Sequence, residues 1–110
     1  MGASTFIEQS VLERLVSRIV EAVQPRRIVL FGSAARGQMG PHSDVDLLVV
    51  MPDGVHRRQT AQHLYRSLMG LDIAKDIVVV TESDVRQFGD EPSLVIMPAL
   101  KEGRELYRAP

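Results

Sequence analysis

Three aspartates occupy positions in the sequence where carboxylates could act together. Asp44 and Asp46 open an otherwise apolar segment, DVDLLVV, and Asp76 opens a second one, DIVVV. Side chains alternate between the two faces of a strand, so residues two apart point the same way, about 6.6–6.8 Å apart along the axis. If the two segments form neighbouring strands, Asp76 can reach the point that Asp44 and Asp46 face.

A group of three carboxylates favours a bound cation, because like charges placed together raise one another's pKa unless a cation compensates them. Mg²⁺ takes hard oxygen ligands and usually keeps coordination positions for water and phosphate. Two such ions about 3.5–4 Å apart would stabilise the attacking and leaving oxygens of an in-line displacement. Each aspartate taken alone also fits a simpler role, as a turn or cap residue at the start of a strand.

A second feature, Gly32-Ser33, follows a short apolar segment and precedes a possible helical turn. Glycine lets the backbone approach a phosphate closely, and the N–H groups at the start of a helix favour anions. Ser33 adds a hydroxyl donor, and Arg36 could neutralise phosphate charge nearby. The segment is not a P-loop, because no Gly-x-x-x-x-Gly-Lys-Ser/Thr pattern is present. Taken alone, Gly-Ser after a strand also fits a plain turn.

The hydrophobic pattern predicts the elements that must position these residues. A helix begins with the capping box Thr5-x-x-Glu8, and Pro25 ends it. A second, more polar helix uses Tyr65, Leu68 and Met69 as its apolar contacts. Continuous apolar strands indicate a small α/β (α+β) domain with a mixed β-sheet flanked by helices. In chain order we expect a helix at 5–23, strands at 28–31 and 45–51, a helix at 55–69, a strand at 76–80, a helix start at 81–84, a helix at 92–102 broken near Pro98, and an extended segment at 105–107.

Length and composition narrow the class of protein. The 110 residues have the size of one domain, and we expect a single domain over 1–110. The chain has no cysteine and no apolar run near the roughly 20 residues that span a bilayer, so we expect a cytoplasmic protein without membrane contact. Its formal net charge of −1 provides no general attraction for nucleic acid, and we expect no direct binding of a duplex. Oligomer formation stays open.

The spacing of these residues resembles a known signature. Gly32-Ser33, ten intervening residues and Asp44-Val45-Asp46 resemble the signature of the polymerase β-like nucleotidyltransferase superfamily. The longer segments LFGSAARG and SDVDLLV are similar to its minimal nucleotidyltransferase (MNT) branch, and the similarity extends over nearly the whole chain. The resemblance implies the polymerase β-like nucleotidyltransferase fold and transfer of a nucleoside monophosphate, with AMP from ATP expected, to an acceptor hydroxyl.

The resemblance also implies roles for individual residues. Asp44 and Asp46 match the metal ligands, and Asp76 matches the third carboxylate, which helps to activate the attacking hydroxyl. Gly32 and Ser33 match the positions that bind the triphosphate. Members of the branch often carry a second basic residue just after the Gly-Ser. This chain has Ala34 there, which we expect to weaken phosphate binding without removing it.

The resemblance suggests a partner as well. Small MNT proteins often pair with a helical HEPN-domain protein as antitoxin and toxin, and they can neutralise the partner by adding AMP to a tyrosine hydroxyl. At this length we expect no separate acceptor-binding domain, which favours a macromolecular acceptor.

Two alternatives remain open. The first is a protein that neutralises a HEPN partner by binding alone. The second is an enzyme for a small cationic acceptor of the aminoglycoside type, for which Asp53, Asp72 and Glu82 could form an acidic pocket. The remaining polar candidates are expected on solvated surfaces, with one histidine in the site loop and the arginines as a possible acceptor surface: His42, His56, His63, Arg57, Arg58 and Arg66.

Overall fold

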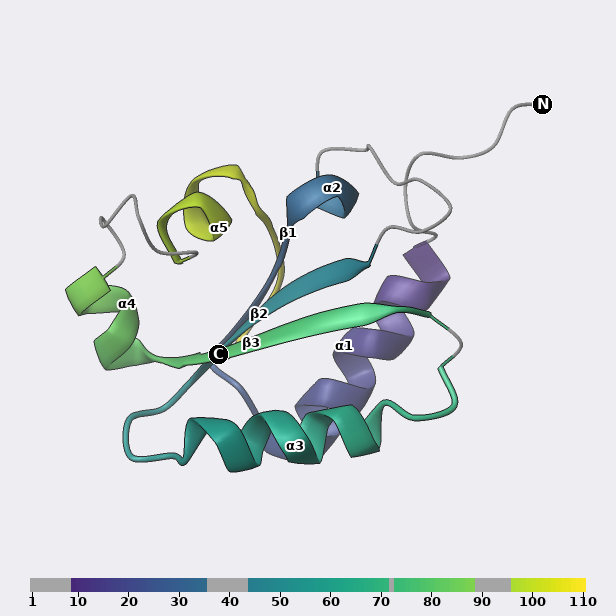
Figure 1. Cartoon of the computed structure of the whole chain (residues 1–110), viewed down its shortest axis with the longest axis horizontal. Helices are drawn as coiled ribbons and strands as arrows, with labels where there is room; N and C mark the ends of the chain where they lie inside the picture. Colours follow the sequence, from purple (N-terminus) through teal and green to yellow (C-terminus); the bar gives the residue numbers. More distant parts are fainter. Residues whose placement is uncertain (1–8, 36–43, 72, 89–95) are drawn as a thin grey trace.

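The computed structural model describes residues 9–35, 44–71, 73–88 and 96–110 of the chain. Within them a four-stranded sheet lies between two groups of helices (Figure 1), which confirms the predicted α/β class. The elements in chain order are α1 (Gln9–Val23), β1 (Arg27–Phe31), α2 (Gly32–Ala35), β2 (Val45–Met51), α3 (Arg57–Ser67), β3 (Lys75–Thr81), α4 (Glu82–Phe88), α5 (Ile96–Glu102) and β4 (Arg104–Arg108).

The sheet is mixed, as the sequence predicts. Its strand order is β3-β2-β1-β4, with β1 antiparallel to both β2 and β4. The pair β2 and β3 is parallel, and α3 connects them. Parallel neighbours need such a crossover because the chain must return to the end of the sheet where the first of the two strands began. As a result β2 and β3 begin at the same end of the sheet, and β1 finishes there.

Both faces of the sheet are covered. Figure 1 shows α1 and α3 on one side and α2, α4 and α5 on the other. Along β2 the apolar side chains alternate between two buried clusters, with Leu47 and Val49 on the α1/α3 face and Leu48 and Val50 on the opposite face. Asp46 has the same parity as Leu48, so its side chain is on the face that α2 and α5 cover.

Helix α1 follows the predicted amphipathic pattern. Leu12, Leu15 and Ile19 form its buried stripe, and each is at most 2% exposed. The helix ends at Val23, and Gln24 follows with φ of +51° before Pro25, as expected for a helix stopped by proline. The predicted capping box at Thr5 and Glu8 lies outside the described residues.

The predicted contacts of the second long helix were partly wrong. Leu68 is fully buried, as expected, but Tyr65 is 40% exposed and Met69 is 71% exposed. The second buried anchor is Leu64 instead. Leu64 and Leu68 are four residues apart and therefore share one face of the helix, whereas Tyr65 and Met69 are each rotated about 100° from them.

Proline does not break the last helix. Pro98 is the third residue of α5, within the first turn, where a backbone N–H has no partner inside the helix. The predicted start of this helix at residues 92–95 lies outside the described part. After α5 the chain adds β4 to the edge of the sheet, which confirms the short extended segment expected at 105–107. No helix in the described residues is long and apolar enough to cross a membrane.

Candidate functional site

The aspartates predicted to act together lie at one end of the sheet. In the parallel pair of β2 and β3, Asp46 is directly level with Asp76. Asp44 immediately precedes β2 and is two residues from Asp46. The expectation that the two apolar strands are neighbours is therefore confirmed, and the backbone places all three residues at this end.

Gly32 lies against this group for a steric reason. In the register of β1 with β2, Phe31 is opposite Asp46, and Gly32 follows at once. Gly32 has φ of +71°, and a Cβ built on it would overlap Oδ2 of Asp46 and lie 3.2 Å from the Asp46 Cγ. Only glycine meets both requirements, since its φ is free and it has no Cβ. The backbone after β1 is thus packed directly against the Asp46 carboxylate.

The rest of the predicted phosphate-binding segment forms the short helix α2. Ala34 is 2% exposed and anchors α2, which packs against β1, β2 and α5. Ser33 is half-buried beside it. Ala34 could not contribute the second basic group that the family resemblance would place there, and its burial gives it a packing role instead. Arg36 lies outside the described residues.

The three carboxylates differ in exposure. Asp44 and Asp76 are exposed, and Asp46 is half-buried. Among the residues that the structure describes, no three His, Cys, Asp or Glu side chains are gathered closely enough to hold a metal ion as they stand. Mutual repulsion of like charges favours such separation.

The donor chemistry nevertheless fits a divalent cation. Carboxylate oxygens are the ligands that Mg²⁺ prefers. Asp46 and Asp76 are level on adjacent strands, and Asp44 immediately precedes β2, so three such groups lie at one end of the sheet. In the chemistry of their donor atoms, the residues therefore fit the metal that the sequence suggests.

One contact at this end was not foreseen. The Tyr65 hydroxyl of α3 donates to Oδ1 of Asp76 at 3.3 Å and accepts a hydrogen bond from the Ile77 backbone N–H at 2.9 Å. The hydrophobic pattern of the sequence predicted an apolar contact for Tyr65 instead. The available signal was its position one residue after the true anchor, Leu64, which turns the ring away from the core.

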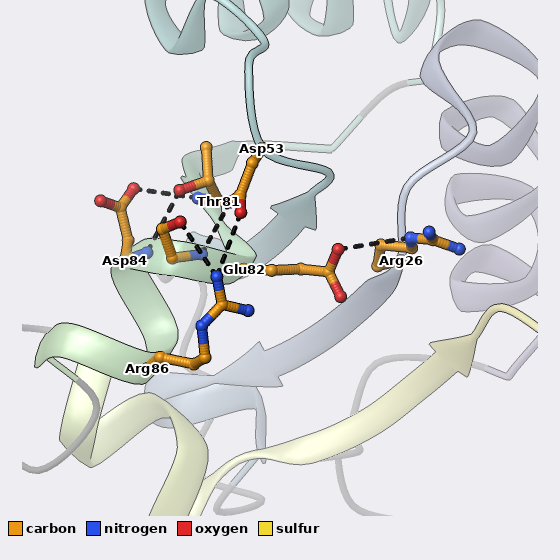
Figure 2. A network of polar contacts seen from close by, with 7 residues as sticks. Arg26, Asp53, Thr81, Glu82, Asp84 and Arg86 are labelled. Carbon is orange, nitrogen blue, oxygen red and sulfur yellow. Dashed lines mark hydrogen bonds and ion pairs between the residues drawn. The ribbon is translucent and has the colours of Figure 1, made fainter.

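The acidic residues considered for a cationic acceptor do not join this site. Figure 2 shows Asp53 and Glu82 near the start of α4, at the opposite end of the sheet. Asp53 accepts from the Ser83 backbone N–H at 2.8 Å and pairs with Arg86 at 3.1 Å. Glu82 pairs with Arg26 at 3.4 Å. Asp72 lies outside the described residues, so the described part of the chain offers no acidic acceptor pocket from these candidates.

Hydrogen bonds at this opposite end stabilise charged carboxylates. The Ser83 backbone N–H, followed by its hydroxyl and by Arg86, lowers the pKa of Asp53. For Asp84, burial alone would raise the pKa, but hydrogen bonds from Thr81 and the charge of Arg57 outweigh it and lower the pKa overall. These groups are structural, and the predicted helix start is confirmed here: the Asp84 N–H donates to Thr81 Oγ1 at 3.2 Å, and the Thr81 N–H donates to Asp84 Oδ2 at 2.9 Å (Figure 2).

Two residues expected on solvated surfaces also have structural roles. His56 is exposed, and its Nδ1 accepts from the Gln59 backbone N–H at 3.2 Å as the N-cap of α3. Arg57 is exposed and pairs with Asp84 at 2.9 Å. Neither lies near the aspartates of β2 and β3. His42 lies outside the described residues.

Comparison with known proteins now identifies the family. The sequence pattern of the nucleotidyltransferase domain matches residues 12–107, which includes every described element that builds the aspartate end. The chain belongs to the nucleotidyltransferase domain family. Nucleotide transfer is the general reaction of such domains, and nucleoside triphosphates and divalent metal ions are what they use.

Two relatives illustrate the membership. A bifunctional uridylyltransferase/uridylyl-removing enzyme of Burkholderia thailandensis is 35% identical over 60 residues, which is 50% of this chain and 7% of that enzyme. This nucleotidyltransferase chain thus spans only a small part of that relative. A crystal structure of a protein from Sulfolobus solfataricus, named as a candidate nucleotidyltransferase, superposes with a TM-score of 0.62 at 18% identity. It covers 90% of this chain and 78% of that one, and it supports the fold.

Proposed function

We propose that this domain transfers a nucleoside monophosphate, AMP from ATP, to a hydroxyl group of a HEPN-domain partner and thereby acts as an antitoxin. The observation that carries the proposal of catalysis is the register of the sheet. It sets Asp46 level with Asp76 and brings the Gly32 backbone against the Asp46 carboxylate. The family membership supports nucleotide transfer, and the resemblance to the MNT branch supports the partner.

In the proposed reaction the acceptor hydroxyl oxygen attacks the α-phosphorus of the nucleotide. A new P–O bond forms, the bond to the β-phosphate oxygen breaks, and pyrophosphate leaves with the electron pair. Asp76 is exposed and takes up or orients the proton of the attacking hydroxyl. Asp44 and Asp46 hold the metal, which when bound neutralises charge on the phosphates.

The segment after β1 holds the leaving phosphates in this proposal. Gly32 has no Cβ and allows close approach, and the half-buried Ser33 supplies a hydroxyl donor. Arg36 adds positive charge. Because the residues act by placing and neutralising charged groups, most of the rate enhancement comes from positioning and electrostatics.

The similarity to part of a uridylyltransferase makes UTP a specific alternative donor. A binding-only antitoxin is the alternative from another class. It would need neither an intact set of carboxylates nor a glycine packed against Asp46.

The test incubates the protein with α-labelled ATP or α-labelled UTP and Mg²⁺, with and without the HEPN partner. The wild type is compared with the double variant Asp44→Asn/Asp46→Asn and with Asp53→Asn as a matched control. Asp53 is an exposed aspartate at the opposite end of the sheet, so its variant should retain activity.

We expect label on the partner with the wild type and the control, and a loss of at least about 1000-fold in the double variant. Transfer from UTP instead would correct the donor. Tight partner binding by both the wild type and the double variant, with no transfer by either, would refute the catalytic proposal and favour neutralisation by binding.

A further inference from the structure

Tyr65 makes two hydrogen bonds that tie a helix to the predicted catalytic strand. Its hydroxyl accepts from the Ile77 N–H at 2.9 Å and donates to Asp76 Oδ1 at 3.3 Å. A tyrosine hydroxyl has a single proton to donate. Because the Ile77 N–H donates to a lone pair of the Tyr65 hydroxyl oxygen, the hydroxyl proton can be directed at the Asp76 carboxylate.

The first of these contacts explains why the ring lies where it does. β3 is an outer strand of the sheet, and outer strands present backbone N–H groups that have no partner in the ladder. The Tyr65 hydroxyl satisfies one of them at the residue directly after Asp76. The contact therefore fixes the hydroxyl relative to the backbone that carries the Asp76 side chain.

The ring itself is carried by a firmly packed helix. Leu64 and Leu68, on either side of Tyr65 in the sequence, are both 0% exposed and anchor α3 against the sheet. Tyr65 is 40% exposed, so its ring reaches past this packed layer toward the outer strand. A tyrosine has only two rotatable side-chain angles, and holding it costs little conformational entropy.

The distance between the Tyr65 hydroxyl and Asp76 Oδ1 indicates how Tyr65 can act on the carboxylate. At 3.3 Å the contact is longer than the usual 2.5–3.0 Å for a hydrogen bond between two oxygens, so it orients the carboxylate more than it stabilises its charge. It engages Oδ1 and leaves Oδ2 for another partner. Polar contacts at such sites often tighten when the substrate is bound.

We propose that Tyr65 is a positioning residue for Asp76: it restricts the rotation of the carboxylate so that one oxygen remains available to the acceptor hydroxyl or the metal. The inference rests on the proposed function of Asp76 and deepens it. It gives α3 a role in ordering the site, although α3 has no phosphate-binding residue in the proposed function. It also explains a half-exposed aromatic residue at the edge of the sheet.

The chain offers a closely matched control. It has two tyrosines, and the second, Tyr107 of β4, lies at the other edge of the sheet, where it is half-buried against the α1/α3 layer. Tyr65→Phe and Tyr107→Phe remove the same hydroxyl group and keep the ring. Both variants are first compared by amide NMR spectra, which report whether they fold. The Ile77 amide should exchange faster with solvent only in Tyr65→Phe.

Two readouts then test the proposal. The first is the Asp76 side-chain rotamer, measured by three-bond NMR couplings without nucleotide. We expect one dominant rotamer in the wild type and in Tyr107→Phe, and averaging in Tyr65→Phe. The second is transfer: we expect kcat to fall about 10–100-fold in Tyr65→Phe while KM for the nucleotide changes less than about 2-fold.

An unchanged Asp76 rotamer in Tyr65→Phe, or an unchanged kcat despite averaging, would overturn the proposal. So would an equal loss of kcat in both tyrosine variants, because it would indicate a general structural effect. Failure of the wild type to transfer any nucleotide would instead contradict the proposed function. The rotamer measurement would still decide separately whether Tyr65 orders Asp76.

Discussion

At one end of the sheet, β1 finishes, β2 and β3 begin, and aspartates are level on neighbouring strands. At the other end, acidic side chains are paired with arginines (Figure 2). The opposite end contains a pocket of about 350 Å³ whose lining includes four arginines, and each of them is in an ion pair. They are Arg26 with Glu82, Arg27 and Arg108 with Glu105, and Arg86 with Asp53.

The two ends thus use the same residue types for different purposes. At the arginine end, ion pairs connect the ends of strands and helices. Exposed ion pairs of this kind contribute about 0–1 kcal/mol each to the free energy of unfolding. Carboxylates of one sign on adjacent strands repel one another. A bound cation would offset that repulsion. Substitutions at the aspartate end should therefore change activity more than stability, and those at the arginine end should do the reverse.

Among the three substitutions that compare the two ends of the sheet, Gly32→Ala should have the largest effect. The new Cβ would meet the Asp46 carboxylate at a backbone φ of +71°, so we expect transfer to fall about 100-fold and unfolding free energy to fall by about 1–3 kcal/mol. Gly54→Ala is the control, because Gly54 has φ of +95° but no atom within 4 Å of an added Cβ. Gly54→Ala should cost less stability, because it strains only the backbone conformation, and it should leave transfer unchanged. Equal activity of the two variants in an initial-rate assay would show that the contact of Gly32 with Asp46 is unimportant.

A smaller effect is expected from Thr81→Ala at the start of α4. The variant loses the Oγ1 acceptor for the Asp84 N–H, and we expect unfolding free energy to fall by about 1 kcal/mol. Denaturant titration measures this loss. Transfer by the variant should match the wild type under conditions where both are folded. A reduced rate there would mean that the two ends of the sheet are coupled.

The smallest effect is expected from Glu105→Gln, and it should depend on pH. Hydrogen bonds from Arg108 and Arg27 lower the pKa of Glu105 below its ordinary value of 4.5, although burial opposes them. A lowered pKa in the folded state adds stability above about pH 4.5, and this stability is lost as the pH falls through the folded-state pKa. Solvent screens these groups, so we expect less than about 1 kcal/mol near pH 7. Denaturant titrations at pH 7 and at successively lower pH values should show the difference between wild type and variant decreasing as the pH falls. A difference that does not change with pH would rule out the charge as its cause.

Much of the aspartate end could be predicted because strand geometry is periodic. Alternation along a strand places Asp44 and Asp46 on one face, and the two apolar runs indicate strands that can be neighbours. The exact level of Asp76 with Asp46 could not be predicted, since parallel register depends on how α3 packs. The same helix explains the missed Tyr65: a shift of one residue in the buried stripe decides whether the ring enters the core or reaches the outer strand.

The sequence pattern also could not predict contacts between polar residues that are far apart in the chain. Asp53 and Glu82 were plausible members of an acidic pocket by residue type alone. Their arginine partners became visible only once the strand ends were placed in space. The cap between Thr81 and Asp84 was predictable because it is local, joins residues three positions apart and is typical of a helix start.

The crossover through α3 has a consequence for the order in which activity can arise during synthesis. Asp46 and Asp76 are level in space but thirty residues apart in the chain, and α3 lies between them in the sequence. Contacts of this range are formed late, because the loop must close before the pairing stabilises it. A growing chain that has emerged only as far as α3 carries the glycine and the first two carboxylates without the third. Under the proposed function, the domain could therefore transfer nucleotide only after the parallel pair of β2 and β3 has formed.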